Sequence, residues 1–473
     1  MNYPNIRGGA IALAALLLGG CASLTPEQNL ADVQQLTQGR TAGAAVTLQR
    51  NNSELQATVN ELLKAPLSAQ SAVRIALLNN PGLQSALATL DISDAARVQA
   101  GSAPNPHFSI GRFAEGDKIE IERVLRFDVV GLLFLPWKTQ WQGQQHELAK
   151  LQAAQEVIRL AAQTRKAWVN AVAAQQTVAY MSQVREAAEA GTELARRMAR
   201  VGNWSRLQQA REQVFLADAT AQLARARQTL FSEREKLTRL MGLWGPRTQF
   251  TLVAHLPELP PQAAEMRDVE AQALRERLDV RSAVAESGYV AQSLGYVKTA
   301  GYLNGLTLGY TSNTTFDNAA GAQEGKSGWE LELPLPIFDW GTARNARAQA
   351  VYLQSTERVR DVAVKARSEA RETYHGWRTS YDLARHYRDE VVPLRKFISD
   401  EVLLRYNGML ASVWDLLADM RAQVMSVNSA IEAQRDFWLM DTDLQMTLTG
   451  TSPGALAGLS GGSVAMGGET KGH

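Results

Sequence analysis

The stretch SGWELELPLPIFDW, residues 327–340, combines an alternating pattern with an abrupt change of period. Its alternating side chains are, in order, Trp329, Glu330, Leu331, Glu332 and Leu333. Because successive residues of a strand point to opposite faces, a strand here has one apolar and one acidic face. The helical pattern of residues 341–406 begins directly after it. This combination favours a strand of a membrane barrel, with its apolar face on lipid; the alternative is a strand of a soluble sandwich.

Glu330 and Glu332 are the candidate pore-lining acids of this strand. A charged side chain on the lipid face of a membrane barrel costs about 2–4 kcal/mol near the bilayer midplane. We therefore expect both carboxylates to face the lumen of a pore.

The composition excludes several classes of function. The 473 residues include 49 Lys and Arg against 48 Asp and Glu, a near balance that argues against a nucleic-acid partner. The single cysteine excludes a disulfide framework and a metal site built from cysteines. The six histidines are scattered, and we find no nucleophile–base set, metal-ligand spacing or phosphate loop. The sequence therefore predicts a protein that is not an enzyme and needs no cofactor, and a secreted enzyme is the weakest reading.

Residues 1–20 have the pattern of a secretory signal, with Arg7 before an apolar run, residues 10–18, that is too short to span a bilayer. The run leads into Leu-Gly-Gly-Cys, which resembles the lipobox of bacterial lipoproteins. That resemblance implies that Cys21 becomes the mature N-terminus and carries acyl chains, which would attach the protein stably to a membrane. Ala22 follows, and by resemblance to the lipoprotein sorting rule it favours the outer membrane. The alternative is an ordinary signal with a chance cysteine.

An arrangement of helix, two strands, long helix and shorter helix occurs twice, in residues 67–256 and again in residues 263–449. Corresponding positions are Asn80-Pro81 with Arg277-Leu278, Arg165 with Arg371, Trp168 with Tyr374, and Val201-Gly202 with Asn407-Gly408. We expect residues 21–66 to form a lipidated, mostly irregular leader with a short helix. Residues 257–262 should link the two repeats, and residues 450–473, rich in Gly, Ser and Ala, should form a disordered tail.

The two predicted strand pairs lie in residues 105–131 and 303–337, the second pair being separated by a polar loop at residues 312–326. In the first pair, Arg123 falls on the apolar side, and a β-bulge would move it to the other face. The opening helix of the first repeat is predicted at residues 67–102. The later helices are predicted at residues 141–201, 206–242, 341–406 and 411–449.

The longest predicted helices, at 1.5 Å per residue, would span about 90–100 Å, which no compact domain accommodates. Pro393 lies inside one of them and should kink it. Apolar residues of the last helix repeat at the four-three spacing of a coiled-coil seam.

From about residue 70 to residue 450, the chain resembles the TolC-type outer-membrane efflux family. The resemblance rests on the duplicated order of elements, the region after Asn80, the strand-to-helix step Leu335-Pro336-Ile337-Phe338-Asp339-Trp340-Gly341, and the turn from Arg405 to Leu417. The family implies a mostly α fold with membrane β structure. Long antiparallel coiled-coil helices would form a periplasmic α-barrel, and four strands per chain would contribute to a homotrimeric 12-strand β-barrel. The residues agree with a multi-chain barrel, since four strands cannot close one and open edges are not tolerated in lipid.

The family keeps its narrowest point near the turns that join each long helix to its shorter partner. Asp415 matches a family aspartate of this aperture, and Asp419, one turn further, is the weaker match. The alternative for Asp415 is an acid placed favourably at a helix N-terminus. Gly202 and Gly408 lie in turns that, in the family, face a periplasmic adaptor; glycine there also suits plain helix capping with a positive φ.

The leading prediction is the outer-membrane channel of a tripartite efflux system, lipid-anchored and extending into the periplasm. It would conduct small molecules or metal ions passively, with an adaptor and an inner-membrane pump as partners. The alternatives are a type I protein-secretion conduit and a structural or adhesive coiled-coil lipoprotein without a pore.

Overall fold

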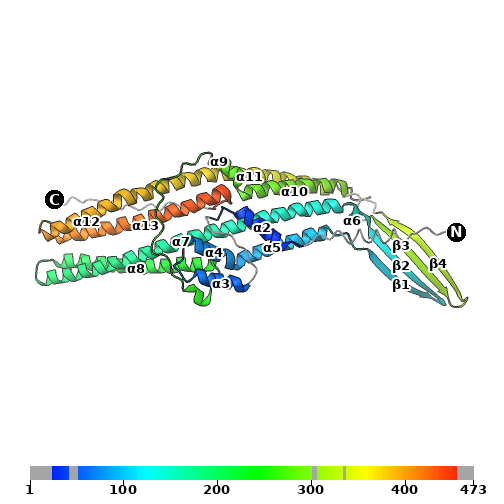
Figure 1. The fold of residues 1–473 in the computed structure, drawn as a ribbon, viewed down its shortest axis with the longest axis horizontal. Coiled ribbons are helices and arrows are strands. Elements are labelled where there is room, and N and C mark those ends of the chain that lie inside the picture. Colours follow the sequence, from blue (N-terminus) through cyan, green and yellow to red (C-terminus); the bar gives the residue numbers. More distant parts are fainter. Residues whose placement is uncertain (1–23, 42–51, 301–305, 334–336, 455–473) are drawn as a thin grey trace. The chain divides into compact units, whose positions relative to one another are not determined.

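A computed structural model describes residues 24–41, 52–300, 306–333 and 337–454 (Figure 1). The predicted signal, Cys21 and the tail beyond residue 454 lie outside these residues. Within them, no helix combines the length and the apolar character needed to cross a membrane. The chain forms two units, each of which takes segments from both predicted repeats. The first comprises residues 1–33, 86–153 and 280–362, and the second residues 34–85, 154–279 and 363–473.

The first unit contains one sheet of four strands in the order β1-β2-β3-β4 (Figure 1). The strands are β1 (His107–Glu115), β2 (Lys118–Asp128), β3 (Thr307–Asp317) and β4 (Ala322–Glu332). All neighbouring strands are antiparallel. Each predicted strand pair forms a hairpin, and the pairing of β2 with β3 joins the two hairpins into one sheet. β1 and β4 are the edges of this sheet.

The predicted polar loop at residues 312–326 is wrong, because both strands of the second hairpin continue through it. β3 and β4 pair along their whole length, from Thr307 opposite Glu332 to Asp317 opposite Ala322. A short turn remains, in which the Asp317 carboxylate accepts hydrogen bonds from the backbone N–H groups of Ala319 (3.0 Å) and Ala320 (2.9 Å). The ladder of backbone hydrogen bonds stabilises this polar part of the hairpin without an apolar side-chain pattern, so the pattern alone did not reveal it.

The β-bulge that could have moved Arg123 to the other face is absent from β2. Every residue of β2 from Lys118 to Asp128 has one partner on β3, in a register without insertions. Arg123 lies opposite Ser312 on β3 and Ile110 on β1. It therefore stays on the face that carries the apolar residues.

The opening helix of each repeat is broken into two. In place of one helix over residues 67–102, the structure has α4 (Ala69–Asn79) and α5 (Pro81–Ala100). Asn80 has an extended backbone (φ −71°, ψ 119°), as expected for a residue before proline. Its side-chain Nδ2 donates a hydrogen bond to the backbone carbonyl of Leu240 at 2.9 Å.

The equivalent break in the second repeat falls at Arg277, between α9 (Val269–Glu276) and α10 (Leu278–Ala300). Its side chain is only 1% exposed. The guanidinium donates two hydrogen bonds to Asp279 (2.9 and 2.6 Å) and one to Glu369 (2.7 Å). Both breaks lie at the positions that the sequence alignment paired, although their side-chain chemistry differs.

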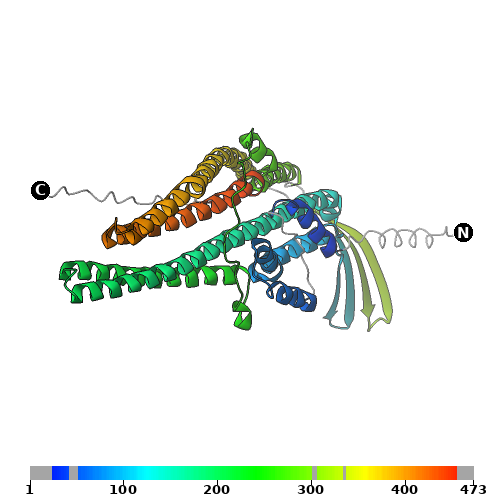
Figure 2. The ribbon, with the colours of Figure 1, turned by 60° about the vertical axis from the view of Figure 1, so that its left-hand side comes forward.

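The later helices follow the prediction with one interruption. They are α7 (Leu135–Arg200), α8 (Arg206–Leu240), α11 (Thr342–His386), α12 (Val392–Asn407) and α13 (Val413–Thr449). A π-helical turn, η2 (Tyr387–Val391), separates α11 from α12 directly before Pro393. Proline cannot donate to the preceding turn, and the helix widens into this π-helical turn next to Pro393, where the sequence predicts a kink. The C-terminal part of α7 lies beside α8, and α12 lies beside α13 (Figure 1 and Figure 2).

The leader is more helical than predicted. It contains α2 (Pro26–Thr37) and α3 (Asn52–Leu62). In α3 the buried residues Leu55 and Val59 are four apart, the spacing of one helix face. The remaining short elements are α6 (Val129–Leu133) and the 3₁₀ turn η1 (Gly245–Thr248).

One core cluster of the second unit lies between α11 and α13. Trp377 and Tyr381 of α11 pack with Phe437, Met440 and Leu444 of α13. The predicted linker crosses this core: the Tyr381 hydroxyl donates to the carbonyls of residues 260 and 261, at 3.1 and 3.0 Å. The linker is therefore held against both helices rather than being a loose tether.

Candidate functional site: the two-faced sheet and the helix tips

Strand pairing assigns each sheet residue to a face, because directly opposite residues of antiparallel strands point the same way. The face that carries Trp329 also carries Phe108, Ile110, Ile119, Ile121, Leu125, Phe127, Leu308, Tyr310, Phe316 and Leu331, together with Arg112 and Arg123. We call it the apolar face. The other face, the charged face, carries Glu115, Glu120, Glu122, Asp128, Asp317, Glu324, Glu330 and Glu332, with His107, Lys118, Arg126 and Lys326.

The apolar face is exposed in the single chain. Trp329 is 72% and Leu331 66% exposed, and the rings of Trp329 and Tyr310 lie 5.1 Å apart between centroids. A contiguous exposed surface of this kind marks contact with a partner or a membrane. The predicted alternation is thus clearest in the rows nearest the helices, whereas Phe113 and Val124 lie on the charged face.

Glu330 and Glu332 lie on the charged face and point away from Leu331, which lies between them. An Arg126 nitrogen lies 3.8 Å from the Glu330 carboxylate, and the Thr307 hydroxyl donates to Glu332 at 3.2 Å. Both acids are exposed, so these contacts are worth little to stability. Their lumen role stays a prediction, but their position away from the apolar face is what that role requires.

Aromatic residues gather where the sheet meets the helices of the first unit. Trp137 of α7 packs edge-on against Tyr296 of α10 at 5.8 Å, and Trp141 stacks on Tyr289 at 5.4 Å. These two tryptophans therefore join α7 to α10. Tryptophan and tyrosine rings at this level suit a membrane interface, where one end of the ring is apolar and the other polar.

The two predicted turn glycines differ in conformation. Gly202, between α7 and α8, has φ +79° and is a left-handed turn residue, as predicted. Gly408, between α12 and α13, has φ −79°, and the positive φ of that turn (60°) belongs to Met409. A left-handed non-glycine residue is uncommon, and the Met409 side chain is 94% exposed. The positive φ expected at Gly408 is therefore found one residue later, at Met409.

Asp415 occupies the third position of α13 and forms a reciprocal capping box with Ser412. Its carboxylate accepts from the Ser412 backbone N–H at 2.9 Å and from the Ser412 hydroxyl at 2.7 Å. These bonds to the charged form hold the pKa of the exposed Asp415 below its usual value. Asp419, one turn further, is only 9% exposed, and its Oδ2 has no hydrogen-bond partner within the described ranges.

A part-buried ion pair that the sequence did not reveal joins the two helical hairpins of the second unit. Glu212 of α8 is 1% exposed and lies 2.8 Å from an Arg421 nitrogen of α13. The Arg421 guanidinium also stacks over the Phe215 ring, 4.7 Å from its centroid. Neither residue has a sequence signal, because the contact depends on the packing of helices far apart in the chain.

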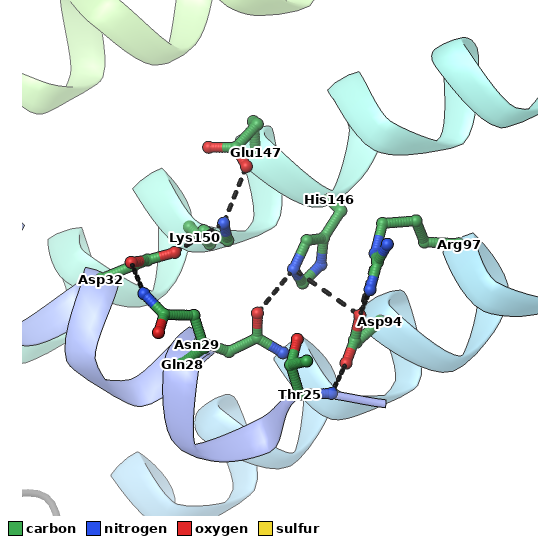
Figure 3. Close-up of polar contacts among 9 residues, drawn as sticks. All are labelled: Thr25, Gln28, Asn29, Asp32, Asp94, Arg97, His146, Glu147 and Lys150. Atoms are coloured by element: carbon green, nitrogen blue, oxygen red, sulfur yellow. Dashed lines mark hydrogen bonds and ion pairs between the residues drawn. The ribbon is translucent and has the colours of Figure 1, made fainter. Parts of the chain in front are cut away.

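A second unpredicted network attaches the leader to the first unit (Figure 3). His146 of α7 is buried, and its Nε2 lies 2.9 Å from the amide oxygen of Asn29 in α2. Asp94 of α5 accepts a hydrogen bond from the Thr25 backbone N–H at 3.0 Å. Burial lowers the pKa of His146, so its neutral form is favoured. On the same helix, Lys150 bonds to Asp32 of α2 at 2.8 Å.

None of these clusters resembles a catalytic or metal centre. Within the described residues, no group of three or more His, Cys, Asp or Glu side chains is placed to hold a metal ion. The notable surfaces are instead the two-faced sheet and the tips of the two helical hairpins.

Comparison with known proteins supports this reading through structure rather than sequence. The sequence matches no protein-family model and no curated protein. The outer-membrane channel OprN superposes with a TM-score of 0.66 at 16% identity, over 87% of this chain and 95% of OprN. The outer membrane protein VceC of Vibrio cholerae gives 0.63 at 16% identity, over 81% and 96%. The MtrE channel of Neisseria gonorrhoeae gives 0.59 at 19% identity, over 81% and 89%.

Each of these matches covers more than four fifths of this chain. OprN and MtrE are outer-membrane channels. The predicted fold class, mostly helical with long helices and four antiparallel strands, is confirmed. The chain has the fold of the TolC-type outer-membrane channels.

Proposed function

We propose that this chain is the outer-membrane channel component of a tripartite efflux system. It conducts small molecules or metal ions passively, after an inner-membrane pump and a periplasmic adaptor have delivered them. The observation that carries the proposal is the sheet: all of its carboxylates lie on one face, and its large aliphatic side chains gather on the other, exposed face. A barrel wall between lipid and water needs this division.

The same sheet supports a homotrimer. β1 and β4 are edges in the single chain, and unpaired strand edges are not tolerated within lipid. Four strands cannot close into a barrel alone, so edges of identical chains must pair with each other. The likeness to trimer-forming channels supports three copies and a 12-strand barrel. A structural or adhesive coiled-coil protein would not need this sheet.

Localisation follows from the same arrangement. The sheet spans the outer membrane, the long helices extend into the periplasm, and acyl chains on Cys21 add a second attachment. The lipid anchor is tested by replacing Cys21 with Ser and measuring the mass of the mature N-terminal peptide. A wild-type peptide without acyl chains would remove the anchor from the proposal.

We further propose that Asp415 contributes to a cation-attracting constriction at the helix tips, with Asp419 as a supporting residue. The exposed, ionised Asp415 side chain at the start of α13 supports this role, because identical chains would repeat it as a ring. Asp419 is buried within its own chain, which makes it the less direct contributor.

Single-channel recording tests both conduction and the constriction. Asp415→Asn removes the charge and keeps an oxygen that can accept the capping bonds, so folding is preserved. The matched control is Asp218→Asn, an exposed acid in the middle of α8. We expect reduced cation selectivity for Asp415→Asn only. Unchanged conductance and selectivity would refute the constriction, and absence of any channel current from the wild type would refute the function.

The hairpin tips are the proposed contact with the adaptor. Beside Gly202 and Gly408, large apolar side chains are exposed at Val201, Met409 and Leu410. Crosslinking in intact envelopes, followed by mass spectrometry, identifies the partners. Recovery of a resistance-nodulation-type pump with its adaptor would support efflux, whereas an ATP-driven exporter would replace it with type I protein secretion.

A further inference from the structure

The apolar face of the sheet carries two arginines on neighbouring strands. Arg123 of β2 lies opposite Ile110, and Arg112 of β1 lies opposite Ile121. The two arginines are therefore diagonal neighbours on one face, a relation that places Cα atoms about 7–8 Å apart. Side chains of this length can reach one common ligand.

Hydroxyl groups lie on the β3 and β4 side of this pair. An Arg123 nitrogen donates to the Thr314 hydroxyl at 3.1 Å, which directs the guanidinium along the sheet surface. Ser312 lies directly opposite Arg123, and Ser327 follows in the same row on β4. We call Arg112, Arg123 and Thr314 the basic patch.

The basic patch has no carboxylate to balance it. Every Asp and Glu of the four strands lies on the charged face, so the two arginines are the charged residues of the apolar face. Arginine keeps its charge in a protein, so it cannot avoid the cost of this position by losing a proton. An external anion is the partner that would satisfy both groups.

The position of the patch along the strands indicates where that anion lies. The rows containing Trp329 and Leu331, with Tyr310 and Leu308 opposite them, lie between the patch and the helices. Beyond the patch, towards the hairpin turns, this face carries one further row, with Ile119, Phe316 and Gln323. A charge on the lipid face is most costly at the bilayer midplane and least costly at the interface. The patch therefore belongs at the headgroup level on the side away from the helices.

We infer that the basic patch binds the phosphate group of a phosphorylated lipid in the outer leaflet of the outer membrane. Guanidinium groups suit this ligand because they form paired, charge-assisted hydrogen bonds with phosphate oxygens, and the Thr314 hydroxyl adds a donor. The inference rests on the proposed function, which places the apolar face on lipid.

Lipid retention tests the site. The full-length protein is reconstituted into nanodiscs of phosphatidylcholine with a minor fraction of lipid A, and retained lipid is counted by native mass spectrometry after mild detergent extraction. The double variant Arg112→Gln/Arg123→Gln should retain about thirtyfold less lipid A, from the attraction of two arginines to anionic lipid. The control Lys326→Gln removes a positive charge at the same level of the charged face, and should retain as much as the wild type.

Two outcomes would overturn the site: equal retention of lipid A by the double variant, or equal retention of enzymatically dephosphorylated lipid A by the wild type. Channel current in pure phosphatidylcholine separates this inference from the proposed function. If the double variant and the wild type both conduct but retain lipid equally, only the lipid site fails. If the wild type forms no channel, the proposed function fails first.

Discussion

Leu331→Arg tests which face of the sheet meets lipid. Ser327 lies in the row of Arg123, and Leu331 is further along the same strand towards the helices. At about 3.3 Å per residue and a strand tilt of about 40°, Leu331 lies roughly 10 Å deeper than the headgroup level set by that row. That depth lies within an apolar band about 25 Å tall, where an arginine costs up to about 2–4 kcal/mol.

The matched control is Gly328→Arg on the same strand. Gly328 lies on the charged face, and a Cβ atom added there meets nothing within 4 Å. Each protein is inserted into phosphatidylcholine vesicles and unfolded with guanidinium, with tryptophan emission as the signal. We expect a loss of about 2–4 kcal/mol for Leu331→Arg and less than about 1 kcal/mol for the control.

The reverse order of the two losses would refute the assignment of the faces. Equal losses would show that neither face meets lipid, and the membrane barrel itself would then be wrong. If Leu331→Arg is as stable in vesicles as the wild type, the membrane barrel would also be wrong, because the substitution places a charge where the proposal requires hydrocarbon.

Three other predictions concern polar groups inside the two units. Arg277→Ala should lower the free energy of unfolding by about 3–5 kcal/mol, because it leaves two carboxylates without their buried cation. The second substitution Glu369→Gln should restore part of this loss, and urea titration measures both changes. Arg421→Ala leaves Glu212 buried and unpaired, so amide exchange in α8 near Glu212 should rise while exchange near the first strand stays unchanged. Burial lowers the pKa of His146 in the folded protein, so the unfolded chain binds a proton at this residue more readily. The stability that neutral His146 contributes is therefore fully present above about pH 6.5. It falls as the pH decreases towards the lower pKa of the folded state. Amide exchange in α2 should therefore rise between pH 7 and pH 5, and His146→Gln should remove this dependence.

The features that were predictable from sequence are those that a local period records. The alternation around Leu331 located a two-faced strand, and long helical periods located α7 and α13 within a few residues. The polar half of the second hairpin was missed because its stability comes from backbone pairing between strands, which leaves no apolar period in the sequence. Glu212 with Arg421 was missed for a related reason, since contacts between helices depend on how their surfaces pack.

Arg123 shows how a residue can break the local pattern without a structural correction. From the sequence alone, a bulge was the simplest way to move its charge off the apolar face. The uninterrupted pairing of β2 with β3 excludes that solution. A charge that is retained against the pattern, beside Arg112 and away from every carboxylate of the sheet, is better explained by a ligand than by a backbone irregularity.

The two broken helices support the duplicated architecture by a different argument. Asn80 and Arg277 occupy the same position in the two repeats, and both have an extended backbone that ends one helix before the next begins. Pro81 explains the first break, but Leu278 could have continued a helix. At the second break, the buried guanidinium bridges Asp279 and Glu369 and holds the backbone in place of proline. The same backbone geometry achieved with unrelated side chains indicates that the fold requires a bend there, so Arg277→Ala should disturb the bend between α9 and α10 whereas Pro81→Ala should leave the first bend largely intact, because Asn80 still binds the Leu240 carbonyl.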